Sequence, residues 1–324
     1  MREFWSLLRT VISPGTFNQM LRSATPVALA AMGGALTEHA GIMNIGMDGM
    51  ILLGAFVGVI GSYLAASATV GVLGAVAFGA VIGLFFALLV VRYRSDEFII
   101  GCALNTFALG ATAYLSRAIF GLSGTSGHYV RSLPRLRLAF LGKIPFIGPI
   151  LNNHSIFVYI TWLLVLVMWL FVYKTPWGFW LRASGEEPET LRTAGKSPER
   201  MQWLASVLCG MFCGLAGAHL SLGYLNGTFT ENMSNSRGFI AFACVIFSAA
   251  NPAKAYLAAL MFGFFDALGY RLQGRISSDL TATIPYLITV VMMVYVVVRS
   301  HRRRRKNQKQ HAEDSGNLSQ APSV

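Results

Sequence analysis

Nine apolar runs divide the chain, and they constrain its fold more than any other feature. The runs lie at about residues 24–36, 49–66, 70–91, 98–120, 155–173, 203–225, 238–250, 253–269 and 284–298. Most approach the roughly 20 residues that a helix needs to cross a bilayer. The chain is 54% hydrophobic and only 12% charged, whereas soluble domains carry about 25% charged residues. We therefore predict an all-α membrane protein, a polytopic helical bundle of about eight to ten transmembrane segments.

The distribution of polar residues divides the chain into three parts. Residues 1–23 lack a continuous apolar core and a small-residue cleavage site, which predicts an amphipathic surface arm rather than a signal peptide. Residues 24–298 form the membrane domain, and residues 299–324 form a basic, disordered tail. Lys and Arg next to a span stay in the cytoplasm and attract anionic lipid. The tail therefore predicts a cytoplasmic C-terminus and membrane lipid, not nucleic acid, as its partner.

Nine crossings, counted back from a cytoplasmic C-terminus, give each connecting segment a side. Residues 174–202 then lie inside, whereas residues 121–154 and the N-terminus lie outside. The segment 121–154 carries four basic residues and no acid, Arg131, Arg135, Arg137 and Lys143. That composition is unusual for a short external loop. Because apolar residues alternate with the basic ones, we expect the segment to lie at the membrane interface as a partly buried lid.

Residues 174–202 are the longest hydrophilic stretch on the predicted inner side. Pro188 suits the first turn of a helix, and Gly195 followed by Pro198 would end it. The acids Glu186, Glu187 and Glu189 favour the positive end of such a helix. A helix of about two turns is marginal in water by itself. We expect tertiary contacts or a protein partner to hold it, although a solvated connector is the alternative.

Two patterns resemble ligand sites but lack residues that such sites require. The letters "TAGKS" end like a phosphate-binding loop, but Thr190 stands where the first glycine is required and no strand precedes it. The four cysteines all fall inside apolar runs, without a histidine or acid at matching spacing. The sequence therefore predicts no nucleotide site, metal site or cofactor of its own.

The stretch "GIMNIGMDGM" at residues 41–50 places polar and flexible residues between two apolar runs. A similar order recurs at "GTFTENMSNSRGF", where an asparagine-containing connector leads through Gly238 into another apolar run. On the orientation above, the two runs travel in opposite directions. We therefore predict inverted repeats with broken helices, which in transporters place the ligand site near the midplane.

Irregular backbone at membrane depth is tolerated where it is buried in protein or lines a wet cavity. We therefore expect Asn44 and Asp48 to face such a cavity, and Asn105 to face protein or water. An amide offers both a donor and an acceptor, which suits a neutral hydroxylated or heterocyclic solute. The alternative is that Asn44 and Asp48 merely cap helix ends at the cytoplasmic edge, with Asp48 as an N-cap.

Three stretches together carry a family resemblance. They are "TPVALAAMGGALTEHAGIMNIGMDGMILLGAF", "GEEPETLRTAGKSPERM" and "FTENMSNSRGFIAFACVIF". From about Ala24 to residue 298, the chain resembles the permease subunits of bacterial ABC importers in the branched-chain amino acid, ribose and nucleoside permease family. Among these it looks most like the nucleoside, or simple sugar, permeases. The resemblance implies a multi-pass protein of the bacterial cell (inner) membrane that imports nucleosides or a related sugar-like solute.

The resemblance also implies partners and roles for particular residues. Separate ABC ATPase subunits would bind ATP and Mg, a second permease, often a paralogue, would pair with this chain, and an extracytoplasmic binding protein or lipoprotein would deliver the solute. The coupling helix that docks the ATPase would comprise Glu186, Glu187, Pro188, Glu189, Leu191, Ala194 and Gly195. The substrate pathway would comprise Asn44, Asp48, Asn105, Phe229, Thr230 and Asn232.

Two other classes of function stay open at this point. A self-sufficient, ion-coupled secondary transporter could also be built on inverted repeats. A membrane-embedded enzyme using Asp48 or His39 is disfavoured, because no acid, histidine and nucleophile cluster at usable spacing. We therefore predict a transport subunit rather than an enzyme.

Overall fold

The computed structural model describes residues 13–121, 124–126, 130–136 and 147–272. The helices are α2 (Pro14–His39), α3 (Met47–Ala65), α4 (Ala68–Ala87), α5 (Glu97–Phe120), α6 (Ile147–Leu151), α7 (Ile156–Lys174), α8 (Pro176–Glu186), α9 (Pro188–Thr193), α10 (Pro198–Ala218), α11 (Arg237–Ser248) and α12 (Pro252–Leu272). Two π-helical segments, η1 (Leu88–Arg92) and η3 (His219–Tyr224), extend α4 and α10. Strands β1 (Arg135–Leu136) and β2 (His154–Ser155) pair antiparallel.

The predicted helical membrane bundle is confirmed. Five helical segments in the described part of the chain are long and apolar enough to cross a membrane. They are Met47–Ala65, Ala68–Arg92, Glu97–Phe120, Ile156–Lys174 and Pro198–Tyr224. The boundary expected at residue 23 falls within α2, because the helix begins at Pro14. The predicted span at 284–298, the tail at 299–324 and residues 1–12 of the predicted arm lie outside the described residues.

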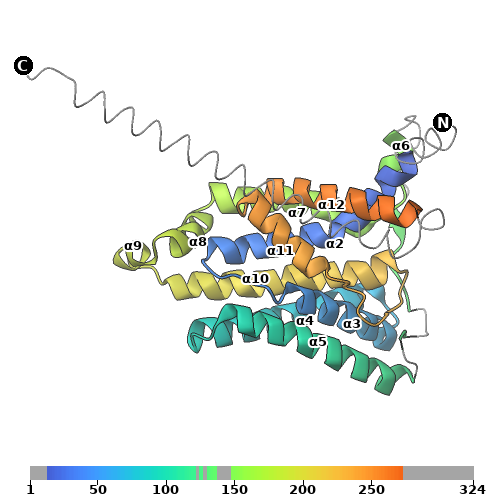
Figure 1. The fold of residues 1–324 in the computed structure, drawn as a ribbon, viewed down its shortest axis with the longest axis horizontal. Coiled ribbons are helices and arrows are strands. Elements are labelled where there is room, and N and C mark those ends of the chain that lie inside the picture. The colour runs from blue at the N-terminus through green and yellow to red at the C-terminus, as the bar shows by residue number, and fades with distance from the viewer. Residues whose placement is uncertain (1–12, 122–123, 127–129, 137–146, 273–324) are drawn as a thin grey trace, which may run out of the picture.

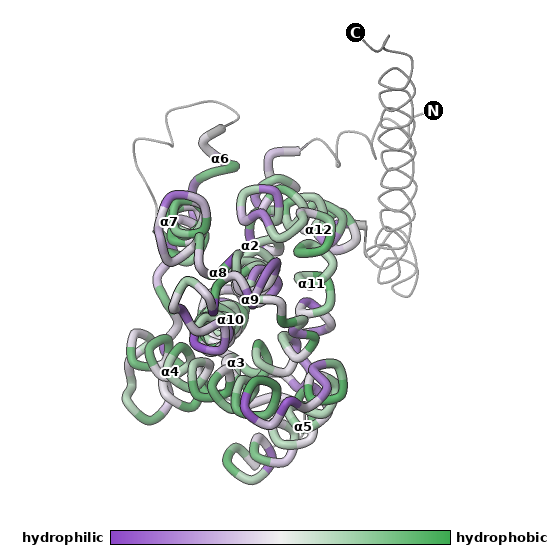
Figure 2. Tube along the Cα trace, turned by 90° about the vertical axis from the view of Figure 1, so that its left-hand side faces the viewer, coloured by the Kyte–Doolittle hydropathy of each residue, from purple (hydrophilic) through white to green (hydrophobic). Residues whose placement is uncertain are grey.

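The long helices run along one axis, with α9 at one end of the bundle and α6 at the other (Figure 1). We call these the α9 end and the opposite end. Seen from the α9 end, α2, α3 and α10 are central, and α4, α5, α7 and α12 surround them (Figure 2). Within their most apolar windows, α3 is 72% buried and α5 and α7 are 28% buried. The outer helices therefore offer wide apolar faces, as expected next to lipid.

The arrangement of helices repeats in inverted form. Helix α2 runs toward the α9 end and α10 runs away from it (Figure 1). Helix α4 packs along α10, and α12 packs along α2. Glycines allow the first of these contacts, because a Cβ atom on Gly79 would overlap the carbonyl of Gly210, and the reverse also holds. Gly79 and Gly210 therefore lie on faces where the two helices pack closely.

Helices α3 and α11 both begin inside the bundle (Figure 1). The amide of Gly49 in α3 contacts Asn105, which lies eight residues beyond the start of α5 at Glu97. At 1.5 Å per residue, α3 therefore begins about 12 Å from that end of α5. Helix α11 has only 12 residues, so it spans about 18 Å. From this shared depth, α3 runs toward the opposite end and α11 toward the α9 end.

The hydrophilic stretch 174–202 contains two short helices, where we predicted one. Helix α9 is the predicted helix, with Pro188 in its first turn and Gly195 just beyond its end at φ +76°. Helix α8 was not predicted. It begins at Pro176, where the Thr175 hydroxyl accepts a hydrogen bond from the Gly178 amide at 3.1 Å. The letters "TPWG" hold this start signal, a capping threonine followed by proline.

Candidate functional site: a polar junction linked to a short surface helix

Asp48 joins the two broken helices at the centre of the bundle. Its side chain lies in the first turn of α3, yet its carboxylate accepts hydrogen bonds from the Gly238 amide at 2.9 Å and the Ser234 hydroxyl at 3.0 Å. Gly238 lies in the first turn of α11, and Ser234 lies in the turn just before that helix. The residue that precedes α3 in the N-cap position is Gly46. Asp48 therefore caps α11 across the bundle, rather than its own helix.

Asn105 does the same for α3 from the side of α5. Its amide oxygen accepts from the Gly49 amide at 2.7 Å, and its amide nitrogen donates to the Ile45 carbonyl at 3.1 Å. Free amide groups at a helix start cost free energy when they are buried. Asn105 thus satisfies backbone that would otherwise be unpaired at membrane depth.

Asn44 lies in the connector between α2 and α3 and is 2% exposed. Its oxygen accepts from the Gly46 amide at 3.0 Å. Its nitrogen faces two sulfur atoms, Cys209 Sγ at 3.4 Å and Met50 Sδ at 3.7 Å. Sulfur is a weak acceptor, so the donors of this amide are only weakly used. In this conformation Asn44 and Asp48 are buried among protein groups rather than exposed to solvent.

The electrostatics of the junction follow from the two helix starts. Each helix N-terminus carries a partial positive charge of about half an elementary charge. The starts of α3 and α11 converge on one carboxylate, that of Asp48. The approach is close, since a Cβ atom on Gly238 would overlap the Asp48 backbone. We call the set of Asn44, Asp48, Asn105, Ser234 and Gly238 the central junction.

We expect Asn105→Leu to destabilise the protein, because it leaves the Gly49 amide and the Ile45 carbonyl without their partner. The loss of a buried hydrogen-bond partner costs about 1–3 kcal/mol. Thr106→Val is the matched control, since the exposed Thr106 hydroxyl bonds only to the Cys102 carbonyl of its own helix. Thermal unfolding in detergent measures the difference. Equal midpoints for the two variants would contradict the capping role of Asn105.

Two segments cover the central junction toward the opposite end. The fully buried Phe229 ring lies 5.1 Å from the Phe56 ring, measured between centroids. The Ser126 amide donates to the Phe229 carbonyl at 2.8 Å, and Thr125 and Thr230 form a β-bridge. Residues 124–126 and 130–133 thus cover residues 222–231 by backbone hydrogen bonds. The described part of the segment 121–154 therefore has the contacts expected of a lid.

The three expected pathway residues of this region have different surroundings. Phe229 is buried in the apolar core, and Thr230 is half-buried at the bridge. Asn232 is exposed in a tight turn, where its φ is +54° and its carbonyl accepts from the Asn235 amide at 3.0 Å. The structure therefore brings Asp48 and Asn105 together around the start of α3, but it leaves Asn232 at the surface.

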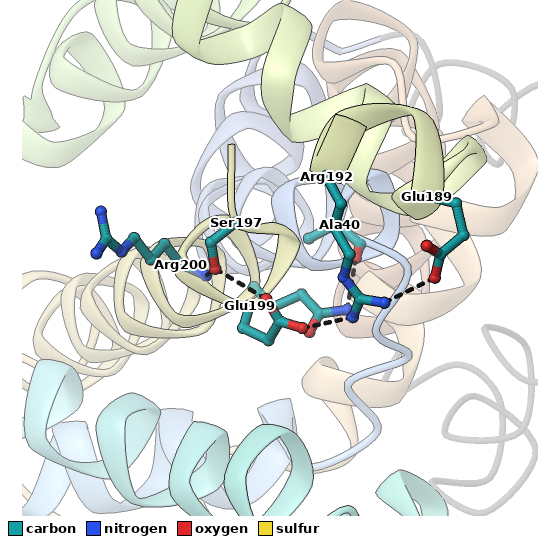
Figure 3. Close-up of polar contacts among 7 residues, drawn as sticks. Ala40, Glu189, Arg192, Ser197, Glu199 and Arg200 are labelled. Carbon is teal, nitrogen blue, oxygen red and sulfur yellow. Dashed lines mark hydrogen bonds and ion pairs between the residues drawn. The ribbon is translucent and has the colours of Figure 1, made fainter. Parts of the chain in front are cut away.

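Helix α9 is tied to α10 by charged side chains (Figure 3). Arg192 contacts Glu189 at 2.7 Å and Glu199 at 2.6 Å. The hydrogen bond to Glu199 and the charge of Glu189 raise the pKa of Arg192 above its usual value. Leu191, which is 3% exposed, anchors the helix to the core. The acids Glu186, Glu187 and Glu189 are exposed, as are Pro188, Ala194 and Gly195.

A chain of contacts leads from α9 toward the central junction. Gln202, one turn beyond Glu199 on α10, donates to the Ala40 carbonyl at 3.4 Å. Ala40 ends α2 and lies four residues before Asn44. A cavity of about 440 Å³ lies beside these contacts, between the connector at Gly41, η1 and α9. These contacts connect α9 with the connector that carries Asn44.

Sequence reasoning missed several of these residues. They are Arg192, Glu199, Gln202, Ser234 and Cys209. The order Ser197, Pro198, Glu199 before an apolar run is a start signal that indicates a helix there. No local signal marks Ser234 or Cys209, because their partners are 186 and 165 residues away in the chain.

Comparisons with known proteins identify the family. Residues 16–297 match the family model described as branched-chain amino acid transport system, permease component. The chain belongs to this family. The guanosine ABC transporter permease protein NupQ of Bacillus subtilis is 31% identical over 90% of this chain and 93% of its own length. The nucleoside ABC transporter permease protein NupC of Lactococcus lactis is 28% identical over 85% of this chain and 89% of its own.

A third relative is named for a sugar rather than a nucleoside. It is an archaeal protein of Haloferax volcanii, provisionally named glucose ABC transporter permease protein TsgC13, and it is 29% identical over 88% of this chain and 92% of its own length. No solved structure matches the chain significantly. Family membership and the apolar helices make the chain a multi-pass membrane permease of an ABC transporter, and they favour this function over a self-sufficient ion-coupled carrier.

Proposed function

We propose that this chain is the membrane-spanning subunit of an ATP-driven importer for nucleosides or a related small sugar-like solute. The observation that carries the proposal is the exposed helix α9, which is linked through Arg192, Glu199 and Gln202 to the connector of the central junction. A permease that is driven by separate ATPase subunits needs such a link. The printed names of the relatives, for guanosine, nucleosides and glucose, support this class of solute.

In this proposal the α9 end faces the cytoplasm. Basic residues near that end are Arg92, Arg94, Lys174, Arg182, Arg192, Lys196, Arg200 and Lys254. Fewer are described near the opposite end, namely Arg22, Arg117, Arg131, Arg135 and Arg271. Cytoplasmic segments next to spans are enriched in Lys and Arg. This difference supports the proposed orientation, and the proposal includes a cytoplasmic C-terminal tail.

ATP binding and hydrolysis occur in partner ATPase subunits, which hold ATP and Mg and dock on α9. Their movement shifts Arg192 and Glu199, and with them α10 and the end of α2. The starts of α3 and α11 then separate, which frees the carboxylate of Asp48 and the amide of Asn44 to meet a solute. The two states of such a permease differ by only a few kcal/mol. The chain itself performs no covalent chemistry.

Two further partners complete the proposed transporter. A second permease, a paralogue of this chain, packs beside it in the membrane. An extracytoplasmic binding protein, or a lipoprotein, docks on the opposite end and delivers the solute. The segment that covers residues 222–231 must move when the solute enters, and exposed residues such as Arg131 and Arg135 lie on that segment.

Co-purification and reconstitution test this function. The chain is expressed with candidate ABC ATPase and permease subunits of the same organism, purified through a tag on this chain, and placed in liposomes. We expect both partners to co-purify. Guanosine uptake should require an ATPase competent for hydrolysis and ATP on the side of the liposome membrane where that ATPase lies. Uptake by this chain alone, driven by an ion gradient, would contradict the proposal and support the secondary transporter.

A further inference from the structure

A cavity of about 250 Å³ lies near the opposite end of the bundle, away from the central junction and from α9. It is bounded by α2, η3 and the small sheet of β1 and β2. The side chains that matter here are Gln19, Arg22, Arg135, Ser155, His219 and Tyr224. They come from four elements that are far apart in the sequence. Apart from Arg135, which lies on the segment that covers residues 222–231, the proposed transport mechanism does not use them.

Two guanidinium groups line this cavity, and the hydrogen bonds described for them go to neutral acceptors. Arg22 donates to the Asn153 carbonyl at 2.7 Å, and Arg135 donates to the Asn226 side-chain oxygen at 3.1 Å. The two positive charges are close enough to repel each other. Among the residues that the structure describes, no carboxylate lines the cavity.

Other arginines of the described chain do have carboxylate partners. Arg117 lies 3.4 Å from Glu231, and Arg237 lies 3.8 Å from Asp266. A half-buried positive charge without a counter-ion is costly. The two positive charges therefore suit this cavity to an anionic ligand.

The neutral side chains in the cavity add hydrogen-bond donors. The Tyr224 hydroxyl accepts a hydrogen bond from Gln19 Nε2 at 2.6 Å, so its own hydrogen remains available to a ligand. The Ser155 hydroxyl lies beside the buried His219, at 3.3 Å from its Nδ1. The π-helical turn of η3 brings His219 and Tyr224 to the same cavity. Such turns occur frequently at functional sites.

We propose that this cavity binds a phosphate group, held by Arg22 and Arg135 and by the Tyr224 hydroxyl. Guanidinium groups match the geometry of phosphate oxygens and bind them through charge-assisted hydrogen bonds. The phosphate can come from the headgroup of an anionic phospholipid or from free inorganic phosphate. Tyr224 ends a predicted membrane span, so the cavity lies at the depth where headgroups begin.

The test compares Arg22→Gln and Arg135→Gln with Arg131→Gln, each in the full-length chain. Arg131 is the matched control, because it is exposed on the same segment as Arg135 and does not line the cavity. Native mass spectrometry counts the phosphatidylglycerol and phosphatidylcholine retained after purification from vesicles that hold equal amounts of both. Thermal unfolding in phosphate, compared with chloride at equal ionic strength, measures binding of the free ion.

We expect each cavity variant to bind the phosphate ligand roughly tenfold or more weakly, since each loses a charge-assisted hydrogen bond. The control should bind as the wild type does. Loss of phosphatidylglycerol alone assigns the site to a lipid headgroup, and loss of the phosphate-induced shift alone assigns it to the free ion. Wild-type retention of the lipid and a wild-type phosphate shift in both variants would overturn the proposal. If Arg22→Gln does not fold, Arg135→Gln, which changes an exposed residue, decides the outcome together with Arg22→Lys. Because Arg22→Lys keeps the positive charge, it should bind the phosphate ligand more tightly than Arg135→Gln.

Discussion

Gly238→Ala is expected to abolish transport and to lower the thermal stability of the protein strongly. The added Cβ atom would overlap the backbone of Asp48, where the starts of α3 and α11 meet. Backbone cannot move aside as the end of a flexible side chain can. The two helix starts must therefore separate, and the hydrogen bonds from Gly238 and Ser234 to Asp48 would break. We expect a loss of several kcal/mol, as for overpacking combined with buried polar groups that lose their partners.

Gly110→Ala provides the matched control for this variant. Gly110 lies in α5, and no heavy atom comes within 4 Å of a Cβ atom built there. Because alanine favours a helix over glycine by about 1 kcal/mol, this change should leave stability unchanged or raise it. Uptake and the unfolding midpoint are measured for both variants. A Gly238→Ala protein with the midpoint and uptake of the wild type would refute the close junction of α3 and α11.

Charge reversal on α9, with Glu187→Lys and Glu189→Lys together, is expected to uncouple the ATPase from the permease. Both carboxylates are exposed, and they lie at the start of the helix that we propose as the docking element. Like charges placed opposite each other in an interface cost several kcal/mol. We therefore expect solute-stimulated ATPase activity to fall more than tenfold, while the purified permease keeps its unfolding midpoint.

The neutral pair Glu187→Gln and Glu189→Gln separates the sign of the charge from the loss of a side chain. It should retain more activity than the reversed pair, because it removes an attraction without adding a repulsion. Glu189 also pairs with Arg192, so reversal of its charge could displace Arg192 as well as prevent docking. Loss of the ATPase on co-purification indicates lost docking, whereas an ATPase that still co-purifies but is not stimulated indicates a displaced Arg192. Normal stimulation and normal co-purification in the reversed pair would exclude α9 as the docking helix.

Much of this fold could be predicted from the sequence, because its signals are local. Apolar runs of about 20 residues predict spans regardless of what lies beside them. Pro188 and Gly195 predicted the position of α9, since proline is favoured in the first turn of a helix and glycine just beyond its end. The opposite directions of α3 and α11 were predicted by counting membrane crossings back from the basic tail.

The partners of the polar residues could not be predicted in the same way. Asp48 was expected to face a wet cavity or, as the alternative, to cap its own helix, whereas its carboxylate caps α11, whose Gly238 is 190 residues later. Such pairing depends on how the two repeats pack, and no spacing within one segment records it. Helix α8 was missed because the predicted polar connector was read as one helix, although Thr175 and Pro176 mark another start.

The burial of the expected pathway residues is a further difference between pattern and structure. A polar stretch at membrane depth must be satisfied by water or by protein, and the sequence alone does not distinguish these. The structure satisfies Asn44 and Asp48 with protein groups. Their contact with a solute stays a proposal, because it requires a second conformation in which α3 and α11 have separated.

A disulfide across the lid tests most directly whether transport requires this bundle to open and close. Thr125 and Thr230 form an antiparallel bridge, and residues so paired lie about 4.5–5.5 Å apart between Cα atoms, which suits a disulfide. The measurement is ATP-driven uptake by Thr125→Cys/Thr230→Cys, with the exposed Cys102 replaced by serine. We predict that oxidation stops uptake and that reduction restores it. Full uptake by a completely cross-linked protein would contradict the account.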